Sequence, residues 1–463
     1  MTQWTVGRLV EATQGELVTG DRSHPVGGLS IDSRRIQPHE AFLAIRGPRF
    51  DGHAFVQEAA ARGAGCLIVS QLPDPLPLLP VIVVPDTVLA LGDAAAFHRR
   101  QFRIPVIAVT GSCGKTTTKE MIAHLLSQDY EVLKTEGTRN NHIGLPLTLL
   151  ELSGSHEVAV VELGSNHSGE IAYLARIANP TMAVVTNVGP AHLEFFGSLD
   201  EVRREKLSML EFLEPKGTAI VPGDQLEVLL QAKSRLGPQT TLLTFGTSGQ
   251  CGIQAVEVRR EDGGQSVRLR DAEGRFFIPL LGSHQVENTL AALACVKALG
   301  ISLEAVRNRL TSFSTLPLRS QLMRGPGVLV LNDCYNANPL SFARALETLK
   351  DLDAERTVVV AGDMLELGEH APAAHEAIGR LAARLGIDVV VAVGSFAPSV
   401  VKGASESGRT TAVACGTVEE VQQRLPAMLR QGDAVLVKGS RKLRLERIAE
   451  WLLHSEGPNA CLA

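Results

Sequence analysis

A run of glycine, lysine and threonine residues follows a predicted buried strand. The segment from Val106 to Glu120 is VIAVTGSCGKTTTKE, which predicts a strand, a glycine turn and a helix that begins at Lys115 and runs to Leu126. Glycines let backbone N–H groups point into one concavity, and the helix N-terminus adds positive potential. Lys115 can reach terminal phosphates, and the Thr116 hydroxyl can hold Mg²⁺. The order of these features predicts a nucleoside triphosphate site rather than an accidental glycine turn, although Val109 replaces the first glycine of G-x-x-x-x-G-K-[ST].

Two further polar side chains follow predicted strands. Glu162 ends the strand in EVAVVELG, and a carboxylate at the carboxyl end of a strand near a phosphate loop is placed to bind a metal. A solvated acid at a strand end is the alternative. His192 follows the strand in TMAVVTNVG. A lone histidine is more often structural, so the interpretation of His192 as a ligand depends on its neighbours.

Lys206 lies on the apolar face of a predicted helix. Val202 precedes it by four residues and Met209 follows it by three, and the same stripe includes Leu199, Leu210 and Leu213. A buried, unpaired ammonium is costly, so Lys206 must reach water, pair or change its chemistry. Two interpretations stay open. The side chain extends along apolar surface to water, or CO₂ converts its amine into a carbamate, which is an anionic metal ligand.

Buried strands and helices alternate around these residues. The segments PVIAVTG, EVAVVELG, TMAVVTNVG and TAIVPGD contain continuous Val, Ile and Ala runs, and helices follow the first three. Such runs are typical of parallel strands that are covered on both faces. The stretch from Thr241 to Pro279 alternates apolar and charged residues and predicts antiparallel hairpins appended to that sheet. A helix that opens near Gln285 closes the unit.

A smaller unit is predicted on each side. Before the central unit, helices at 6–12 and 54–62 alternate with the strands AFLAI at 41–45 and CLIVS at 66–70. The proline-rich PDPLPLLP that follows predicts a linker or an edge segment. After Pro317, the strands VLVLND, TVVVAGD, DVVVAVG and DAVLVKGS alternate with helices. We therefore expect an α/β protein with a small mixed amino-terminal domain, a central phosphate-loop domain with a parallel sheet, and a Rossmann-like carboxyl-terminal domain.

Composition excludes several classes of protein. The chain has 463 residues, 44% of them hydrophobic and 21% charged, with a net charge of −5. No stretch approaches the roughly 18 apolar residues of a membrane span, and no basic block indicates nucleic-acid binding. The seven cysteines are scattered without Cys-x-x-Cys spacing, and the start has no secretory pattern. We expect a cytoplasmic protein that begins at Met1 and acts on small, polar substrates.

Together these segments resemble the Mur ligases of peptidoglycan synthesis. The loop TGSCGKTTTKE, the ELG at 162–164, the AHLE at 191–194 and the helical Lys206 are similar to that family's phosphate loop and metal-site segments. Members have three domains and join a carboxylate to an amine at the expense of ATP. The segments RNNHIGLPLTLL, NDCYNANP and GDMLELG resemble the member that adds D-alanyl-D-alanine to the UDP-N-acetylmuramoyl tripeptide. The segment IDSRRIQPHEAFLAIRGPRFDGHAF resembles a UDP-binding domain.

The resemblance implies roles for individual residues. ATP would contact Gly111, Ser112, Cys113, Gly114, Lys115, Thr116, Thr117, Asn288, Arg319, Asp333 and Tyr335. Mg²⁺, expected as two ions, would be held by Thr116, Glu162, His192 and a carbamylated Lys206. Lys115, His192 and Lys206 would be catalytic. The substrates would contact Ser33 and Arg34 at the UDP end, Asn140 and Asn141 near the sugar-peptide, and Asn336, Asn338 and Lys438 at the acceptor. Leu318 stands where a glycine usually precedes the arginine.

The same resemblance implies a division of the chain and leaves alternatives. Residues 1–84 would bind UDP, residues 85–314 would bind ATP, and residues 315–463 would close over ATP and the acceptor. We expect a monomer. The ligase that adds the third residue is one alternative, although its Asp-Asn-Pro-Arg motif is missing here. A folylpolyglutamate synthase and a regulatory P-loop ATPase are the others, and the latter would not need Lys206. Cys113 and Cys334 are interpreted as small packed thiols rather than catalytic ones.

Overall fold

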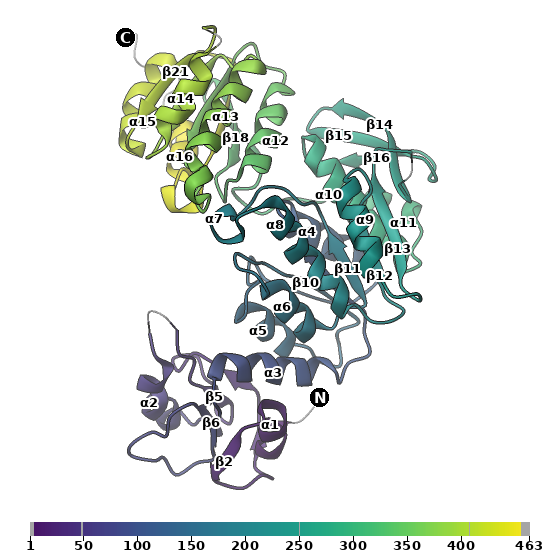
Figure 1. Ribbon diagram of the computed structural model, residues 1–463, viewed down its shortest axis with the longest axis vertical. Coiled ribbons are helices and arrows are strands. Elements are labelled where there is room, and N and C mark those ends of the chain that lie inside the picture. The colour runs from purple at the N-terminus through teal and green to yellow at the C-terminus, as the bar shows by residue number, and fades with distance from the viewer. Residues whose placement is uncertain (1–3, 48–49, 250, 407, 455–463) are drawn as a thin grey trace.

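The computed structural model describes residues 4–47, 50–249, 251–406 and 408–454. Amino-terminal, central and carboxyl-terminal α/β units follow one another in an elongated molecule (Figure 1). This arrangement confirms the predicted fold class. Within the described residues, no helix combines the length and the apolar character needed to cross a membrane.

The amino-terminal unit is built on a sheet with the strand order β2-β7-β6-β5-β4, in which only β2 runs antiparallel to its neighbour. Its elements are β1 (Trp4–Thr5), α1 (Val6–Thr13), β2 (Glu16–Thr19), β3 (Pro25–Val26), β4 (Leu29–Ser30), β5 (Ala41–Leu43), η1 (Gly52–Phe55), α2 (Val56–Ala61), β6 (Cys66–Val69), β7 (Val81–Val83) and α3 (Thr87–Arg99).

The proline-rich PDPLPLLP is a loop inside this unit, so its prediction as a linker or edge segment is wrong. It joins β6 to β7, and β7 lies between β2 and β6 in the sheet. Val81 and Ile82 are fully buried there. Proline lacks a backbone donor, but the chain re-enters the sheet directly after Pro80. The following helix, α3, packs against α1 and also against α5 (Gly144–Leu150) and α6 (Glu170–Ala178) of the central unit.

The central sheet has the strand order β16-β15-β14-β13-β12-β11-β8-β10-β9. In this order, the strands from β14 through β8 to β9 are parallel to their neighbours. Strands β14, β15 and β16 form an antiparallel meander. Its elements are β8 (Val106–Thr110), α4 (Lys115–Leu126), β9 (Val132–Lys134), α5 (Gly144–Leu150), β10 (Val158–Glu162), α6 (Glu170–Ala178), β11 (Met182–Val185), α7 (Leu193–Phe196), α8 (Leu199–Leu207), η2 (Ser208–Phe212), β12 (Thr218–Pro222), α9 (Leu226–Arg235), β13 (Thr241–Gly246), β14 (Ile253–Glu261), β15 (Gly264–Leu269), β16 (Arg275–Ile278), α10 (Ser283–Ala298) and α11 (Leu303–Leu310).

Successive residues of β8 face opposite cores, as expected for a strand covered on both sides. Ile107 and Val109 pack into the core beneath α4 and α10, whereas Val106 and Ala108 pack into the core beneath α5 and α6. The hairpins predicted for Thr241 to Pro279 are confirmed from β14 onward. The prediction is wrong for β13, which extends the parallel sheet beside β12. Alternating burial indicates that one face of a strand is covered. It does not distinguish a parallel strand from an antiparallel one.

The carboxyl-terminal unit has a sheet with the order β17-β18-β22-β19-β20-β21, parallel except for β17. The four strands that the sequence predicted form its interior, and the two it missed form its edges. Its elements are β17 (Gln321–Gly325), β18 (Val328–Asp333), α12 (Pro339–Lys350), β19 (Thr357–Gly362), η3 (Gly368–His370), α13 (Ala371–Arg384), β20 (Val389–Val393), α14 (Ala397–Ser405), β21 (Thr411–Cys415), α15 (Val418–Arg424), η4 (Leu425–Met428), β22 (Asp433–Lys438), η5 (Arg441–Leu443) and α16 (Glu446–His454).

Candidate active site

The phosphate loop connects β8 to α4 and depends on two glycines with positive φ. Gly111 has φ +148°, and Gly114, which directly precedes α4, has φ +77°. A Cβ on Gly114 would lie 2.2 Å from the Oδ1 of Asn288, so this turn leaves no room for a side chain. Lys115 Nζ donates a hydrogen bond to the Gly111 carbonyl oxygen at 2.7 Å. The lysine therefore folds back over its own loop, where phosphates bind in such turns.

Replacing Gly114 with alanine is expected to lower ATP affinity at least about tenfold, because the new methyl group would displace Asn288 or distort the loop. Gly300 provides the control, since it has φ +79° and a Cβ there would meet no atom within 4 Å. Gly300→Ala should cost about 1 kcal/mol of stability and leave ATP affinity within about twofold. Nucleotide titration and urea unfolding of both variants measure this, and equal affinities would contradict the close contact.

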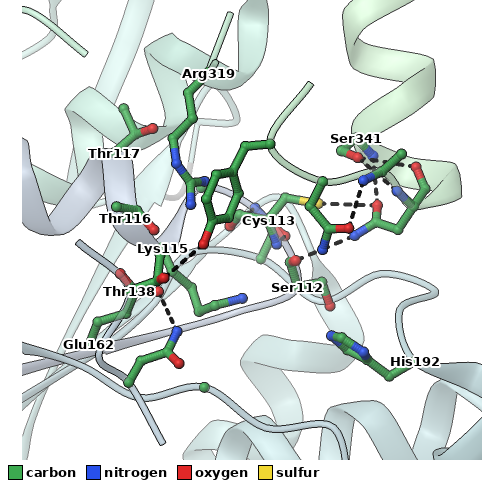
Figure 2. A pocket seen from close by; sticks show the side chains of 18 of the residues that line it. Ser112, Cys113, Lys115, Thr116, Thr117, Thr138, Glu162, His192, Arg319 and Ser341 are labelled. Atoms are coloured by element: carbon green, nitrogen blue, oxygen red, sulfur yellow. Dashed lines mark hydrogen bonds between the residues drawn. The ribbon is translucent and has the colours of Figure 1, made fainter. Parts of the chain in front are cut away.

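A cavity of about 500 Å³ lies between the central and carboxyl-terminal units (Figure 2). Most of the residues predicted from the sequence line it: Ser112, Cys113, Gly114, Lys115, Thr116, Thr117, Asn140, Asn141, Glu162, His192, Asn288, Arg319, Asp333, Tyr335, Asn336, Asn338 and Lys438. These residues come from both units. The cavity is therefore completed only when the two units lie against each other as they do here.

Glu162 is placed to hold a cation. It ends β10 and is 1% exposed, and Asn140 Nδ2 donates to its Oε1 at 2.7 Å. Its Oε2 is buried and has no partner among the described residues. An unpaired buried carboxylate oxygen is costly, so the site fits a bound cation. Within the described chain, no three His, Cys, Asp or Glu side chains form a ready-made metal cluster. Other ligands, such as the Thr116 hydroxyl or phosphate oxygens, would have to complete the coordination.

Lys206 lies behind the cavity rather than on its wall. It is 1% exposed at the end of α8, and its Nζ donates to Ser165 Oγ, a residue of the cavity wall, at 2.7 Å. No ion pair joins it to a carboxylate in the described part of the chain, and neighbouring Glu205 accepts backbone N–H groups from Gly169 and Ile171 instead. The interpretation that Lys206 reaches water along apolar surface is therefore wrong.

The predicted apolar stripe around Lys206 runs along α8 and η2 and has two exceptions, one of which is Leu213, which is only half-buried just after η2. Val202, Met209 and Leu210 are buried, but Leu199 is 41% exposed because it occupies the first turn of α8. Burial, reinforced by the positive charge of Lys115, lowers the pKa of Lys206 to about 7. In a large fraction of the molecules, the Lys206 amine is therefore uncharged at neutral pH, and an uncharged amine is nucleophilic.

This shift predicts how stability depends on pH. The folded pKa of Lys206 is about 7, below its unfolded value of about 10.4. The unfolded chain therefore binds more protons between these pH values, and the folded state gains stability as pH rises through this window. In CO₂-free buffer, the unfolding free energy of the wild type relative to Lys206→Met should rise from pH 7 to pH 9, by at most about 1.4 kcal/mol per pH unit. Urea unfolding measures this, and a flat difference would contradict the lowered pKa.

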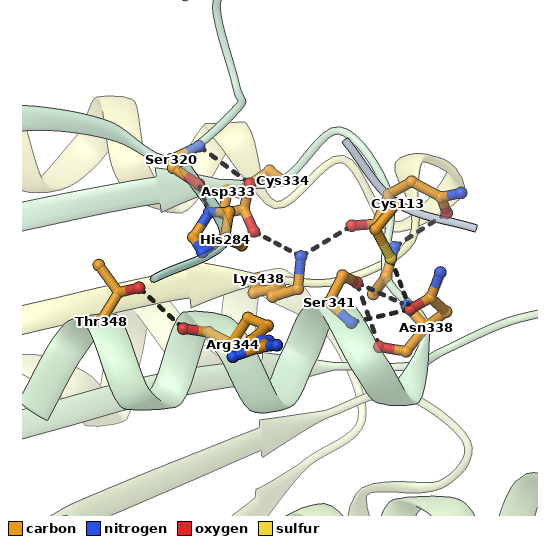
Figure 3. Close-up of polar contacts among 12 residues, drawn as sticks. Cys113, His284, Ser320, Asp333, Cys334, Asn338, Ser341, Arg344, Thr348 and Lys438 are labelled. Atoms are coloured by element: carbon orange, nitrogen blue, oxygen red, sulfur yellow. Dashed lines mark hydrogen bonds and ion pairs between the residues drawn. The ribbon is translucent and has the colours of Figure 1, made fainter. Parts of the chain in front are cut away.

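Asp333 and Lys438 form a largely buried pair at the ends of neighbouring strands β18 and β22 (Figure 3). Lys438 Nζ donates to Asp333 Oδ2 at 2.5 Å and to the carbonyl oxygen of Asn336 at 3.0 Å. The Ser320 N–H donates to Asp333 Oδ1 at 2.9 Å. Burial alone would raise the pKa of Asp333, but the ammonium of Lys438 outweighs it and the pKa is lowered. Asp333 is thus an ionised acceptor with both oxygens engaged.

Arg319 and Tyr335 stack beside this pair. The guanidinium lies 3.8 Å from the centre of the Tyr335 ring, and the Tyr335 hydroxyl is 2.7 Å from Thr138 Oγ1 of the central unit. Leu318 has φ +66°, in the left-handed region that favours glycine. The turn before Arg319 therefore has the left-handed conformation that a glycine adopts easily. Leucine adopts it here at a cost of about 1–2 kcal/mol.

Two cysteines lie in the loops of this site. Cys113 Sγ lies 3.3 Å from Asn338 Oδ1, and Asn338 Nδ2 approaches the Ser112 carbonyl oxygen at 3.5 Å, so the predicted acceptor residue touches the phosphate loop. Burial raises the pKa of Cys113 and of Cys334, which fits packed thiols. The described cysteines are free, and Cys461 lies outside the described residues.

Ser33 and Arg34 are not brought to the cavity. Ser33 Oγ donates to Glu58 Oε2 at 3.2 Å, and Arg34 pairs with Asp32 in the amino-terminal unit. Other cavity residues were missed by sequence reasoning. Asn187 holds the phosphate loop through two hydrogen bonds to the Cys113 backbone, at 3.0 and 3.1 Å. Its position two residues after β11 was the available signal. Thr138, Ser165, His284 and Glu366 were also missed.

Comparisons with known proteins agree with this geometry. The family descriptions "Mur ligase family, catalytic domain", "Mur ligase middle domain" and "Mur ligase, glutamate ligase domain" match residues 25–99, 109–296 and 318–441. A UDP-N-acetylmuramoyl-tripeptide–D-alanyl-D-alanine ligase from Bacillus subtilis (strain 168) is 35% identical over 98% of this chain and 99% of its own length. The chain belongs to the Mur ligase family.

Solved structures of Mur ligases support the same assignment. MurF from Acinetobacter baumannii is 35% identical, with a TM-score of 0.90 over 98% of this chain and 100% of that one. A MurF ligase from Thermotoga maritima in complex with ADP is 29% identical, with a TM-score of 0.81 over 92% of this chain and 96% of that one. The chain is also similar to solved structures of the two alternatives, a ligase for 2,6-diaminopimelate at 21% identity and a folylpolyglutamate synthase at 18% identity. Identity this low shows a shared fold alone.

Proposed function

We propose that this Mur ligase joins D-alanyl-D-alanine to the UDP-N-acetylmuramoyl tripeptide with ATP and so makes the pentapeptide precursor of peptidoglycan. The observation that carries the proposal is the shared cavity, in which Lys115 and Thr116 of the phosphate loop face Asn336, Asn338 and Lys438 of the carboxyl-terminal unit. The relative from Bacillus subtilis has the same activity in its name and matches over nearly its whole length.

The chemistry requires activation of a carboxylate. An oxygen of the tripeptide's terminal carboxylate attacks the γ-phosphorus of ATP, the bond from that phosphorus to the β-phosphate oxygen breaks, and ADP leaves. The amine of D-alanyl-D-alanine then attacks the acyl carbon, phosphate leaves with the carboxylate oxygen, and the nitrogen loses a proton. Lys115 stabilises the negative charge that develops on the transferred phosphoryl group. The contact between Asn338 and the phosphate loop supports an acceptor side next to this phosphoryl group.

The residues present fit Mg²⁺. Thr116 and the free Oε2 of Glu162 would hold one ion with ATP, and His192 with a carbamylated Lys206 would hold a second. When bound, Mg²⁺ supplies charge neutralisation at the phosphates. The buried, unpaired oxygen of Glu162 supports the first position. The second position depends on the modification of Lys206.

Carbamylation of Lys206 fits its surroundings. The neutral Nζ attacks CO₂, a nitrogen–carbon bond forms, and loss of a proton leaves an anionic carbamate. The neutral amine is available because the pKa of Lys206 is about 7. The nearby charge of Lys115, which disfavours an ammonium there, would instead attract the carbamate. The modification would thus replace the repulsion between two ammonium groups, Lys206 and Lys115, with an attraction between a carbamate and an ammonium.

We also propose a role for each of the three domains. Residues 1–84 bind the UDP part of the substrate, with Ser33 and Arg34 at its UDP end. Residues 85–314 bind ATP, and residues 315–463 close over ATP and the acceptor. The protein acts as a monomer in the cytoplasm.

Acceptor choice tests the proposal. Purified protein with ATP, Mg²⁺ and UDP-tripeptide should release phosphate when D-alanyl-D-alanine is added, and single amino acids should not replace the dipeptide. Coupled detection of phosphate measures both reactions. The assignment is falsified if a single amino acid serves and the dipeptide does not. Phosphate release without any carboxylate substrate would indicate a regulatory ATPase instead.

A further inference from the structure

His192 and Glu366 meet across the boundary between the central and carboxyl-terminal units. His192 directly precedes α7, and Glu366 lies in the loop between β19 and η3. His192 Nδ1 is hydrogen-bonded to Glu366 Oε2, and the Glu194 N–H donates to the Glu366 carbonyl oxygen at 3.3 Å. Both side chains line the cavity. A residue that no sequence argument selected thus holds the ring of a predicted metal ligand.

Both partners of this pair have strained backbones. His192 has φ +53° and Glu366 has φ +62°, and neither is a glycine. Such a conformation costs of order 1 kcal/mol at each residue and persists only where the surroundings require it. Close packing of the two segments supports this requirement, since a Cβ on Gly368 of η3 would lie 3.2 Å from the Glu194 Cα of α7. Both residues with left-handed backbones are thus the ones whose side chains meet.

The hydrogen bond determines which ring nitrogen has a free lone pair. An ionised carboxylate only accepts, so the proton of the bond is on Nδ1 of His192. In a neutral imidazole, Nε2 then has the lone pair that a metal requires. Figure 2 shows the His192 ring pointing toward the phosphate loop. The other nitrogen is therefore presented to the cavity in the form that can bind a cation.

We propose that Glu366 is a positioning residue, which fixes His192 as the Nδ1–H tautomer with Nε2 free for Mg²⁺. Because the two residues belong to different units, the carboxylate reaches the ring only when the carboxyl-terminal unit lies against the central one. Docking of that unit thus prepares a metal ligand of the central unit. The role of the metal rests on the proposed function, whereas the tautomer and its dependence on Glu366 do not.

Three variants test whether an acceptor oxygen at position 366 sets the tautomer of His192. Glu366→Gly removes the carboxylate and relaxes the left-handed backbone, so loss of folding is not expected. Glu366→Gln keeps an oxygen that accepts from Nδ1. Glu369→Gln removes an exposed carboxylate three residues further along and serves as the control. NMR of the ¹⁵N-histidine-labelled, metal-free full chain reports the tautomer of His192, whose signal is identified by its loss in His192→Gln.

We expect the Nδ1–H tautomer in the wild type, Glu366→Gln and Glu369→Gln, and the Nε2–H tautomer in Glu366→Gly. The Mg²⁺ concentration for half-maximal phosphate release should rise about tenfold in Glu366→Gly alone, with the KM for ATP within about twofold. An unchanged tautomer in Glu366→Gly, or equal shifts in all three variants, would overturn the proposal. A chain with the expected tautomers that forms no pentapeptide would support the positioning role and refute the proposed function.

Discussion

Replacing Lys115 with methionine is expected to reduce ATP-dependent amide formation by about 10³-fold, which corresponds to about 4 kcal/mol of transition-state stabilisation. Lys115 is the ammonium that lies over the phosphate loop, 2.7 Å from the Gly111 carbonyl oxygen. Burial lowers its pKa, but the phosphates of ATP would favour its charged form. Methionine keeps the length of the side chain and removes only the charge.

Lys297→Met is the matched control, since Lys297 is exposed at the end of α10. It should retain activity within about twofold. Steady-state rates of product formation, with melting temperatures to verify folding, measure both variants. If Lys115→Met kept a tenth of the wild-type rate, the catalytic role of Lys115 would be refuted.

Replacing Lys206 with alanine is expected to lower activity by about 10²-fold, the loss typical when a metal ligand or its support is removed. Short carboxylic acids such as propionate should restore part of that activity, because the truncated side chain leaves a buried space beside Ser165. An added carboxylate can occupy this space and replace the carbamate oxygens. Rates measured against increasing propionate concentration give the rescue.

Lys206→Met separates chemistry from packing. Methionine fills the space and cannot be carbamylated, so this variant should be as inactive as Lys206→Ala and show no rescue. A lysine with only a structural role predicts the opposite, because methionine would then restore activity by filling the space beside Phe196 and Ser165. Activity in Lys206→Met near that of the wild type would therefore refute carbamylation.

The parts of the site that sequence reasoning found have local signals. The phosphate loop is contiguous in the chain, and its glycines, lysine and threonine depend on one strand, one turn and one helix. The position of Lys206 on the buried side of its helix followed from helical periodicity, since Val202 and Met209 define the stripe on which it lies, but only the structure shows that its ammonium does not reach water. The interior strands of the carboxyl-terminal sheet were found for a similar reason, because burial on both faces requires continuous apolar runs.

The parts that were missed depend on contacts between distant segments. Thr138 meets Tyr335 and Glu366 meets His192 across the boundary between units, and no periodicity links such pairs. The edge strands β17 and β21 were missed because edge strands are partly exposed and their residues are more mixed. The loop before β7 was misjudged because its prolines indicate an interruption without showing that the sheet resumes afterwards.

The most direct measurement of the proposed ligase activity follows an oxygen atom. The UDP-tripeptide is labelled with ¹⁸O in its terminal carboxylate and incubated with the protein, ATP, Mg²⁺ and D-alanyl-D-alanine, and mass spectrometry analyses both products. An acyl phosphate route predicts the pentapeptide amide together with one ¹⁸O in each released phosphate. Phosphate without ¹⁸O, or phosphate without the amide, would contradict the assignment of this chain as the ligase that adds D-alanyl-D-alanine.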